Sequence, residues 1–465
     1  MTERSRSSAP GFGRRAFLRY AGGAAVVLPL SALAGCAQGS SRDPNLIRIA
    51  YQQFGSGTLW EDWINGAAED FRQSSPEHTI ELLPIVAAEN DYFTKNELLM
   101  SSPRTSPDIT YEDTFILLSD VAAGYLQPMD QFIEGWEHWD NIAGAAQAAV
   151  TGEDGHIYGA PTHTDTRALW FNQELMAEAG LSEQWEPQTW EDILETARTI
   201  KQELPDVAPF FMYSGMAQGE KASMQGFQML FYGTGSTLYD EDTQKWVLGS
   251  QGFLDTLDFI RIIFEEELTL SLAQHLDPNV EETIYSQLIP EGRLAIQLDG
   301  SWVAQNWVDG GAHPWPEWTD VMDLTPMPTQ DGGGNGWVTL AGGWCLSIPQ
   351  HATDPEAAFA FIEELSRTET MVDFSIANNY ITVREDVAEN EDYRGYSPSA
   401  EFFTELLEGA QYRPALPAYP EVSNAIQDAM EAVMTMSQTP EQAAAAYDAA
   451  VTDIVGEENV QDESA

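Results

Sequence analysis

The sequence predicts an α/β protein of two lobes, each with a mainly parallel sheet flanked by helices. From residue 46 onward, apolar strand-like runs alternate with amphipathic helical segments, a pattern typical of parallel sheets covered on both faces. The alternation restarts near residue 156, which indicates a second sheet. With 465 residues, 43% of them hydrophobic, the chain is long enough to form two substantial cores.

Residues 1–35 are predicted to be an export signal rather than part of the fold. Gly13–Arg19 contains a twin-arginine motif, and the apolar run that follows it is too short for a stable membrane span. The run ends in Leu33-Ala34-Gly35-Cys36, which matches a bacterial lipobox. We therefore expect lipid on Cys36, a tether over residues 36–45, and anchoring to the outer face of the cytoplasmic membrane. The twin-arginine route implies that the protein folds before export.

The chain is strongly acidic: 74 Asp and Glu against 21 Lys and Arg give a formal net charge of −53. This charge excludes nucleic acid as a partner, because phosphate contacts require basic patches. It also disfavours anionic ligands. A solvated acidic surface that serves solubility, as in a salty habitat, explains the charge best. Once Cys36 carries lipid, Cys345 is the only other cysteine, so we expect no intrachain disulfide and a small buried hydrophobe at this position.

The first lobe is expected to comprise residues 46–164 and 341–385. Its first three strands are predicted at 46–51, 79–86 and 107–111, with helices at 58–73, 91–101 and 115–123. Ligands of such sheets bind where a strand ends and the chain turns into a helix. Gln53, Glu89, Asn90 and Asp113 occupy such positions. Asp113 could equally cap the following helix, and the sequence leaves both roles open.

The second lobe is expected to comprise residues 165–340 and 386–456. Its strands are predicted at 167–172, 209–213 and 291–298, and its main helices at 222–232, 253–267, 422–436 and 440–455. Crossings between the lobes are expected near Asp165, residues 339–341 and residues 383–386. Residues 457–465 read as an acidic, disordered tail.

The stretch Trp337–Ile348 contains a double glycine followed by a tryptophan. We expect a strand on either side of a break at Gly342 and Gly343, where a ligand or another backbone can approach closely. Trp344 would then present an apolar face and one N–H donor, which suits a sugar ring. The alternative is a β-bulge with Trp344 in the core.

Several of these segments together resemble the extracellular solute-binding proteins of carbohydrate ABC transporters, in particular the trehalose/maltose-type branch. The segments are the lipobox, Gly159–Asn172, Glu291–Trp302, Gly342–Trp344 and Tyr412–Gln442. The resemblance implies a periplasmic-binding-protein fold of type II with the ligand in the cleft between the lobes. It also implies a monomer without cofactor or metal, which is not an enzyme and delivers a di- or oligosaccharide to an ABC permease.

The resemblance further implies roles for individual residues. Asp113 and Asp165 would accept hydrogen bonds from sugar hydroxyl groups, and Trp302 and Trp344 would stack on the sugar ring. Gly343 would offer its backbone groups to the sugar. Arg413 would bind sugar hydroxyl groups from the far lobe. His163 lies where a tyrosine is common, and Gln225 lies in the helical region on the second-lobe side. The loop after the first strand lacks the expected acidic residue, and Tyr92 lies where a basic residue often occurs. Because of these two departures, the sequence does not predict the identity of the sugar.

Other interpretations remain at this point. Trp302 could belong to the core or to a helix staple, and Arg413 could form a surface salt bridge. His163 beside Asp165 could suggest a metal or catalytic pair, but no second His lies at ligand spacing, which favours a satisfied polar residue. A lipid-anchored glycoside hydrolase, using two of the many carboxylates, is one alternative function. A lipoprotein that binds a metal, an oligopeptide or another non-sugar solute is a second alternative.

Overall fold

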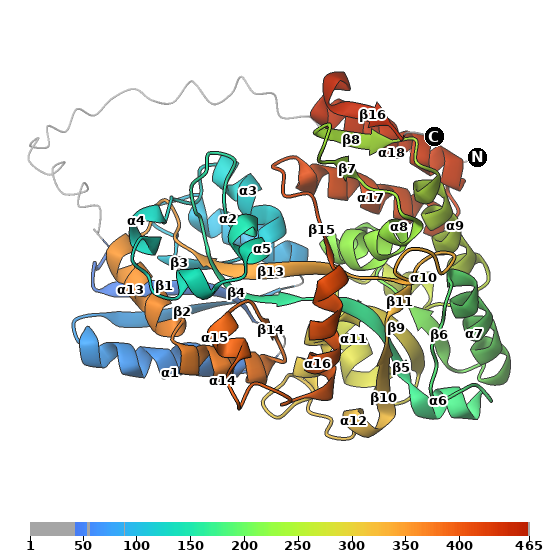
Figure 1. Ribbon diagram of the computed structural model, residues 1–465, viewed down its shortest axis with the longest axis horizontal. Helices are drawn as coiled ribbons and strands as arrows, with labels where there is room; N and C mark the ends of the chain where they lie inside the picture. Colours follow the sequence, from blue (N-terminus) through green and yellow to red (C-terminus); the bar gives the residue numbers. More distant parts are fainter. Residues whose placement is uncertain (1–41, 54–55, 88, 464–465) are drawn as a thin grey trace, which may run out of the picture. The chain divides into compact units, whose positions relative to one another are not determined.

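The first sheet gathers strands from distant parts of the chain (Figure 1). The computed structural model describes residues 42–53, 56–87 and 89–463, so the predicted export signal and Cys36 lie outside the described residues. The sheet has the order β14-β4-β13-β3-β1-β2, with β15 also paired to β13. Its strands are β1 (Leu46–Gln53), β2 (Thr79–Val86), β3 (Ile109–Asp113), β4 (Ala160–Asp165), β13 (Leu340–Ser347), β14 (Ile381–Thr382) and β15 (Gln411–Tyr412).

The second sheet has the order β10-β5-β9-β6. Its strands are β5 (Arg167–Asn172), β6 (Ala208–Phe211), β9 (Leu294–Gly300) and β10 (Met322–Thr325). Smaller sheets pair β11 (Met327–Pro328) with β12 (Trp337–Val338), and β7 (Tyr239–Asp240) and β16 (Val460–Asp462) with β8 (Lys245–Leu248).

The α/β class and the two lobes are as predicted, but the sheets are mixed rather than mainly parallel. β1 runs parallel to β2 and β3, whereas β13 is antiparallel to both β3 and β4. In the second sheet, β5 is antiparallel to β9 and β10, and only β6 is parallel to β9. The reason is that β13 enters the first sheet from the second lobe and therefore runs against its neighbours.

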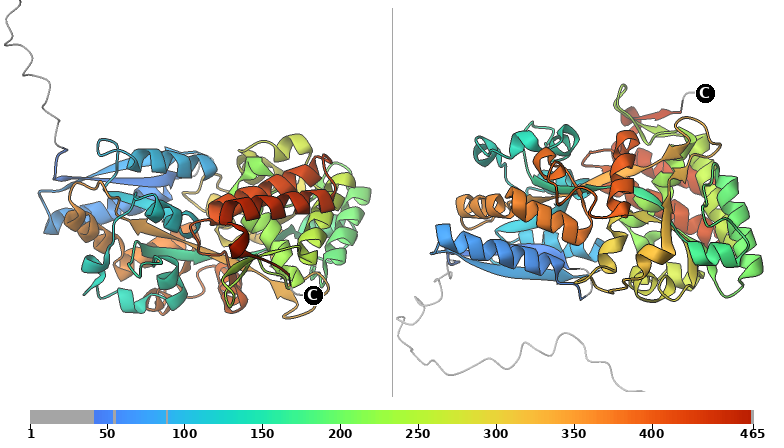
Figure 2. Two further views of the ribbon diagram at one scale, coloured as in Figure 1. Left: turned by 90° about the horizontal axis from the view of Figure 1, so that it is seen from above. Right: turned by 60° about the horizontal axis from the view of Figure 1, so that its bottom comes forward.

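Helices cover both faces of each sheet, because the strands bury side chains on both sides. In β5, Leu169 and Phe171 face one core while Ala168 and Trp170 face another, as the two-residue period of a strand requires. Helices α7, α9, α17 and α18 build the first of these cores, and η5, η6 and α16 the second. In the other lobe, α1, α13 and α14 pack on one face, with α2 and α3 on the opposite face. The lobes lie at opposite ends of both views in Figure 2.

The helices have the following bounds. The α-helices are α1 (Leu59–Ser74), α2 (Glu89–Met100), α3 (Thr114–Ala122), α4 (Asp130–Ile133), α5 (Gly144–Ala149), α6 (Gln173–Glu178), α7 (Trp190–Glu203), α8 (Met229–Phe231), α9 (Gln251–Glu265), α10 (Leu272–His275), α11 (Val280–Thr283), α12 (Trp318–Val321), α13 (Pro355–Leu365), α14 (Thr368–Asn378), α15 (Glu385–Ala388), α16 (Pro398–Glu405), α17 (Tyr419–Met434) and α18 (Pro440–Val455). The 3-10 helices are η1 (Trp139–Asn141), η2 (Met216–Gln218), η4 (Tyr232–Thr234), η6 (Ser301–Asn306), η7 (Leu406–Gly409) and η8 (Glu457–Asn459), and the π-helices are η3 (Ala222–Gln228) and η5 (Ile284–Leu288).

Two segments that pass between the sheets are tied to each other. The chain leaves the first sheet after β4 and enters the second at β5, and it returns between β12 and β13 at Thr339. The Thr339 hydroxyl accepts the Arg167 N–H and donates to the Arg167 carbonyl, both at 2.8 Å. This reciprocal pair holds the two crossing strands side by side.

The predicted strand break at the double glycine is wrong. β13 continues through Gly342 and Gly343, and neither residue has a positive φ. The irregularity lies one residue later, where the register against β4 shifts between Trp344 and Cys345. Gly342 is closely packed, because a Cβ at this position would lie 3.0 Å from Asp165 Oδ1 and 3.2 Å from Arg413 Nη2.

The C-terminal tail, expected to be disordered, is folded over its described residues. β16 pairs in parallel with β8, and the Glu463 N–H donates to the Leu248 carbonyl at 2.8 Å. The prediction of a disordered tail is therefore wrong for these residues. Backbone hydrogen bonds to the open edge of β8 hold the segment in place despite its acidic composition.

The predicted helix at 222–232 is also modified, since its first two turns form the π-helix η3. Gly226 within it allows close approach to Tyr213, whose carbonyl oxygen would lie 2.1 Å from an added Cβ.

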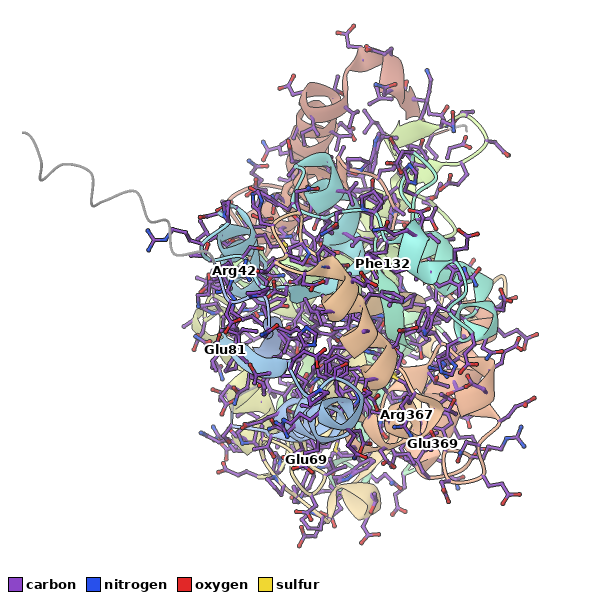
Figure 3. All side chains as sticks on the ribbon, turned by 90° about the vertical axis from the view of Figure 1, so that its left-hand side faces the viewer. Arg42, Glu69, Glu81, Phe132, Arg367 and Glu369 are labelled. Atoms are coloured by element: carbon purple, nitrogen blue, oxygen red, sulfur yellow. The ribbon has the colours of Figure 1, made fainter. Side chains whose placement is uncertain are left out.

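Several acidic side chains are exposed on the outer face of the first lobe. Glu69, Glu81 and Glu369 are exposed there, with Arg367 among them, while Phe132 packs beside α13 (Figure 3). Within the described ranges, no helix combines the length and apolar character needed to cross a bilayer.

Candidate ligand-binding site

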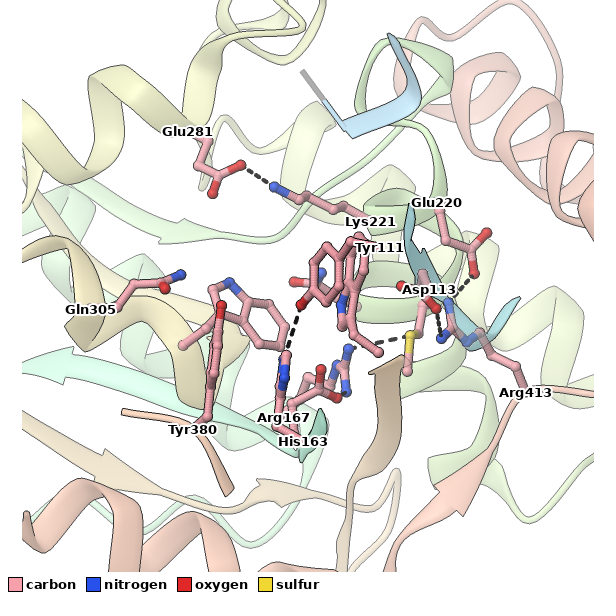
Figure 4. Close-up of a pocket in the computed structure, with 15 residues that line it drawn as sticks. Tyr111, Asp113, His163, Arg167, Glu220, Lys221, Glu281, Gln305, Tyr380 and Arg413 are labelled. Atoms are coloured by element: carbon pink, nitrogen blue, oxygen red, sulfur yellow. Dashed lines mark hydrogen bonds and ion pairs between the residues drawn. The ribbon is translucent and has the colours of Figure 1, made fainter. Parts of the chain in front are cut away.

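A pocket lies between the two lobes and is lined by side chains from both (Figure 4). The first lobe contributes the ends of β3 and β4 together with Trp344 of β13, and the second lobe contributes η3, α11 and η6. The lining residues are Tyr111, Asp113, His163, Asp165, Arg167, Glu220, Lys221, Met224, Gln225, Glu281, Trp302, Gln305, Trp344, Tyr380 and Arg413.

Arg413 joins carboxylates of the two lobes inside this pocket. Its Nη2 lies 2.8 Å from Asp113 Oδ1, and its Nη1 lies 3.1 Å from Glu220 Oε1. Asp113 also caps α3 by accepting the Phe115 N–H at 2.9 Å, so the capping role is confirmed. The same carboxylate lines the pocket, and its role in ligand binding stays a prediction. Glu220 accepts further hydrogen bonds from the hydroxyls of Tyr419 and Ser423. Arg413 is therefore a buried ion-pair partner, not a surface salt bridge.

Burial and ion pairing compete in setting the pKa values of these groups. Burial raises the pKa of both Asp113 and Glu220, and the Arg413 guanidinium opposes that rise. For Arg413 itself, burial lowers the pKa, but the two carboxylates outweigh it and the pKa is raised overall. The guanidinium consequently stays charged, and the two carboxyl groups share one cation.

Asp165, Arg167 and Trp302 form a second group at the crossing from β4 to β5. Arg167 Nη1 contacts Asp165 Oδ1, and Asp165 Oδ1 also accepts the Gly342 N–H at 2.8 Å. The Arg167 guanidinium lies 4.8 Å from the centre of the Trp302 ring, a cation–π distance. The ring itself lies over Gly300, where an added Cβ would approach it to 1.9 Å. Trp302 is thus positioned by a glycine and an arginine on neighbouring strands.

Trp344 lines the pocket but belongs to an aromatic cluster as well. Tyr111 stacks on it at 4.3 Å with an angle of 16° between the ring planes, and Phe93 stacks at 5.9 Å. Trp344 is therefore half-buried, with ring contacts in an aromatic cluster and a place in the pocket lining, and its role in ligand binding stays a prediction.

His163 is a buried, uncharged residue of the pocket wall. Its ring stacks on Tyr380 at 3.7 Å, and Thr162 Oγ1 lies 3.0 Å from its Nδ1. Burial lowers the pKa of His163 to about 3, so the imidazole is neutral at physiological pH. No cluster of three His, Cys, Asp or Glu side chains suited to a metal occurs in the described part of the chain.

Two buried polar atoms of the pocket residues have no hydrogen-bond partner among the residues that the structure describes. They are Gln225 Oε1, an acceptor, and Arg167 Nε, a donor. Gln225 is 4% exposed and Arg167 3% exposed. An unpaired buried polar group costs about 1–3 kcal/mol, and a ligand or an ordered water that paired these atoms would recover that free energy.

The sequence from residue 57 to residue 372 matches the family of bacterial extracellular solute-binding proteins. This chain belongs to that family. An arabinooligosaccharide-binding protein of Halalkalibacterium halodurans is 24% identical over 287 residues, which are 59% of this solute-binding protein but only 57% of the relative.

Solved structures share the fold of this solute-binding protein. A solute-binding protein of Thermotoga lettingae, bound with α-D-tagatose, superposes with a TM-score of 0.75 at 22% identity, over 88% of this chain and 99% of that one. Maltose-bound MalE3 of T. maritima gives 0.75 at 21% identity, over 88% and 100%. At such low identity these likenesses establish the two-lobed fold and nothing about the ligand.

The structure brings most of the predicted ligand residues of this solute-binding protein into the one pocket. Those that line it are Asp113, His163, Asp165, Gln225, Trp302, Trp344 and Arg413. Gly343 lines an adjacent hollow beside α5, and Gln53 lines a smaller cavity that shares Gln305 with the main pocket. Glu89 and Asn90 begin α2, but their side chains lie outside what the structure describes, as does Cys36.

Sequence reasoning missed several pocket residues, namely Tyr111, Arg167, Glu220, Lys221, Met224, Glu281, Gln305 and Tyr380. Two of them carried a usable signal. Arg167 is two residues after Asp165, and Tyr111 two before Asp113, and alternate residues of an extended segment share a face. Glu220, Lys221 and Glu281 lie in helical or irregular segments without periodic patterning, so only the fold places them here.

Proposed function

We propose that this protein binds a sugar outside the cytoplasm and delivers it to an ABC importer. The observation that carries the proposal is the pocket between the lobes, where aromatic rings lie beside an unpaired buried acceptor on Gln225 and an unpaired donor on Arg167. A sugar hydroxyl is both donor and acceptor, and a sugar ring has C–H faces that pack on aromatic rings. The match to a relative named for arabinooligosaccharide supports the same ligand class.

The lobes supply complementary contacts, so the ligand favours a closed form. Asp113 and Trp344 belong to the first lobe, whereas Gln225 and Trp302 belong to the second. A ligand that touches both walls binds the closed form better than the open one and shifts the population toward closure. We propose that the permease recognises this closed form, and that lipid on Cys36 keeps the monomer at the outer face of the membrane.

The direct test is a thermal-shift screen followed by calorimetry. The panel should contain neutral mono-, di- and oligosaccharides, including trehalose, maltose, maltodextrins and arabinooligosaccharides. Ligand at one hundred times its Kd stabilises the folded state by about 2.7 kcal/mol, which gives a clear rise in melting temperature. Absence of a shift with every sugar would reject the proposal.

Chromatography of the sugars after incubation separates binding from hydrolysis. A binding protein returns the oligosaccharide intact, whereas cleavage of the glycosidic bond would identify a hydrolase. Stimulation of permease ATPase activity by the loaded protein, but not by the empty one, tests delivery.

A further inference from the structure

A groove runs along the outside of the first lobe between α1 and α14, which lie side by side (Figure 1). The two helices are antiparallel: the Arg367 guanidinium lies 3.5 Å from Asp70 at one end, and the Phe374 ring stacks on Trp63 at 4.0 Å farther along both helices. The groove has a volume of about 490 Å³, and its α1 side extends from Leu59 to Asp70. This is about 16 Å at 1.5 Å per residue, or about three turns of a third helix.

The floor of the groove is built from small and aromatic residues. Trp63 and Phe374 are 8% and 1% exposed, and Ala67 belongs to the same core cluster. Gly66 is exposed, and a Cβ added to it would meet no atom within 4 Å. The missing side chain leaves room over the α1 backbone, where side chains of another helix can approach closely.

Acidic ridges flank this floor at helical spacing. On α1, Asp62 and Asp70 lie one turn before and one turn after Gly66, and on α14 Glu369 lies one turn before Asp373. All four carboxylates are on exposed residues. Residues four apart lie on the same side of a helix, so each helix presents a row of negative charge along one wall of the groove.

These carboxylates have little positive charge near them. Arg367 is the only cation among the described residues that line the groove, and it is shared with Glu364 outside the lining. In the described ranges, neither Glu369 nor Asp373 forms an ion pair or a side-chain hydrogen bond. Figure 3 shows Arg367 and Glu369 at this end of the groove, with Glu69 on the neighbouring α1. Like charges four residues apart destabilise a helix, so the arrangement favours a partner that brings positive charge.

We propose that the groove binds a helix of another protein, one that carries Lys or Arg on both sides of a narrow apolar stripe. The stripe packs on the floor over Gly66, and the cations pair with the carboxylates of the two ridges, as in other interfaces where a helix fills a groove. A second copy of this acidic chain, a nucleic acid or an anionic lipid surface would each bring negative charge to the ridges. The inference goes beyond sugar binding and does not depend on it.

The groove is separate from the sugar pocket. Among the described residues, none lines both the groove and the pocket between the lobes. The end of the groove at Leu59 reaches the boundary of the lobes, where the Thr58 N–H donates to the Gly310 carbonyl at 3.4 Å. The other end, at Asp70, leads into the turn before β2. A bound helix therefore lies along the outside of the first lobe and leaves the sugar pocket open.

The experiment uses a synthetic probe helix of about 15 residues, long enough to form in water. Leucines form one stripe of the probe helix, and lysines lie four residues apart on either side of it. The control peptide has the same composition, with leucines and lysines distributed all around the helix. Fluorescence anisotropy of the labelled peptides measures their binding to the mature chain, residues 36–465, and to its variants.

Two double variants test the acidic ridges. Glu369→Gln/Asp373→Asn removes the row of charge on α14. Its matched control is Glu401→Gln/Glu405→Gln, because Glu401 and Glu405 are also exposed and four residues apart, on α16 and outside the groove. The two variants change the net charge of the protein equally, so a difference between them reports the groove rather than the acidic surface as a whole.

Two single variants test the floor. Gly66→Leu fills the groove, and Gly144→Leu is its control, because Gly144 is exposed on α5 and also has room for a Cβ. Leucine forms helices better than glycine, so the melting temperature of Gly66→Leu should not fall. Weaker binding of the probe helix by this variant therefore cannot be assigned to unfolding.

We expect the mature chain to bind the probe helix at least about tenfold more tightly than the control peptide. Glu369→Gln/Asp373→Asn and Gly66→Leu should each weaken binding of the probe helix by about tenfold, whereas both control variants should stay within about twofold of wild type. Sugar affinity, measured by calorimetry, should be the same in all variants as in wild type.

Equal affinity for the two peptides would overturn the groove as a helix site and leave only general attraction of cations to an acidic surface. Equal losses in Gly66→Leu and Gly144→Leu, or in the two double variants, would overturn it as well. A dimer of the free protein in light scattering that Gly66→Leu dissociates would replace the partner helix by a second copy. Loss of sugar affinity in Gly66→Leu would assign the groove to support of the pocket instead. Failure of wild type to bind any sugar would reject the proposed function and leave this inference standing.

Discussion

Asp113 and Arg413, which are 300 residues apart in the sequence, meet through a 2.8 Å contact between Oδ1 and Nη2. Both side chains are nearly inaccessible, at 9% and 6% exposure. Asp113 ends a strand of the first sheet, and Arg413 also forms an ion pair with Glu220 of the second lobe. This contact is therefore a buried electrostatic link between the walls of the pocket.

Replacing Arg413 by methionine should weaken both the fold and ligand binding. The substitution leaves Asp113 and Glu220 buried without their common cation, and breaking a buried pair in this way costs about 3–5 kcal/mol. Urea unfolding should show the loss, and calorimetry should show weaker sugar binding. The matched control is Arg261→Met, because Arg261 pairs with Glu265 on the exposed side of α9 and such a pair contributes about 0.3–0.5 kcal/mol. Equal effects of the two substitutions would contradict the link.

Trp344→Ala should lower affinity and stability together. The ring lines the pocket and also stacks on Tyr111, so its loss removes a ligand contact worth at least about tenfold in affinity and opens a cavity in the cluster. Phe93→Ala is the control, since Phe93 stacks on Trp344 without lining the pocket. It should reduce the melting temperature while the sugar Kd changes much less. A Trp344→Ala variant with unchanged Kd would remove Trp344 from the site.

Asp120 should make the protein less stable as pH rises from about 4 to about 8. Burial, assisted by the charge of Glu97, raises the pKa of Asp120 to about 8 in the folded state, whereas an unfolded Asp titrates near 3.9. Between these values the folded form binds more protons than the unfolded form, so the free energy of unfolding falls with pH and levels off above pH 8.

Asp120→Asn should flatten this dependence and be more stable than wild type at pH 8. Urea unfolding at pH 5, 6.5 and 8 measures the slope, with Glu69→Gln on the exposed face of α1 as control. A wild-type slope retained in Asp120→Asn would show that other groups cause the pH dependence.

Salt should raise the melting temperature of the free protein. The net charge of −53 produces repulsion among surface carboxylates such as Glu69, Glu81 and Glu369, and screening by salt reduces it. Thermal melts in KCl from about 0.05 to about 1 M should move upward steadily. A melting temperature that stays constant or falls over this range would show that repulsion among surface carboxylates does not significantly destabilise the folded protein.

The sequence predicted elements that depend on local patterning. The helix predicted at residues 58–73 is amphipathic in sequence, and the structure forms α1 there with a buried face that includes Trp63 and Phe71. Asp113 was found because it lies at the end of a predicted strand, whereas the role of Asp165 came from the resemblance to sugar-binding proteins. The resemblance to sugar-binding proteins added Trp302 and Arg413, which no local pattern marked. The residue ranges assigned to the two lobes stay a prediction.

What the sequence did not predict depends on contacts between distant segments. The direction of β13 is set by its return from the second lobe, so the parallel sheet expected from local alternation became mixed. Lys221 and Glu281 are 60 residues apart, and nothing in their own segments links them. The strand at Val460–Asp462 forms because β8 offers an open edge, which composition alone does not reveal.

The pairing of β16 with β8 has a consequence for how the chain is made. The last described residues of the chain complete a sheet whose other strands are synthesised some 200 residues earlier. The second lobe can therefore assemble fully only after residues 460–462 have left the ribosome. Export through a translocon that threads nascent chain would separate these partners, whereas the predicted twin-arginine signal would carry the lobe across after it is complete.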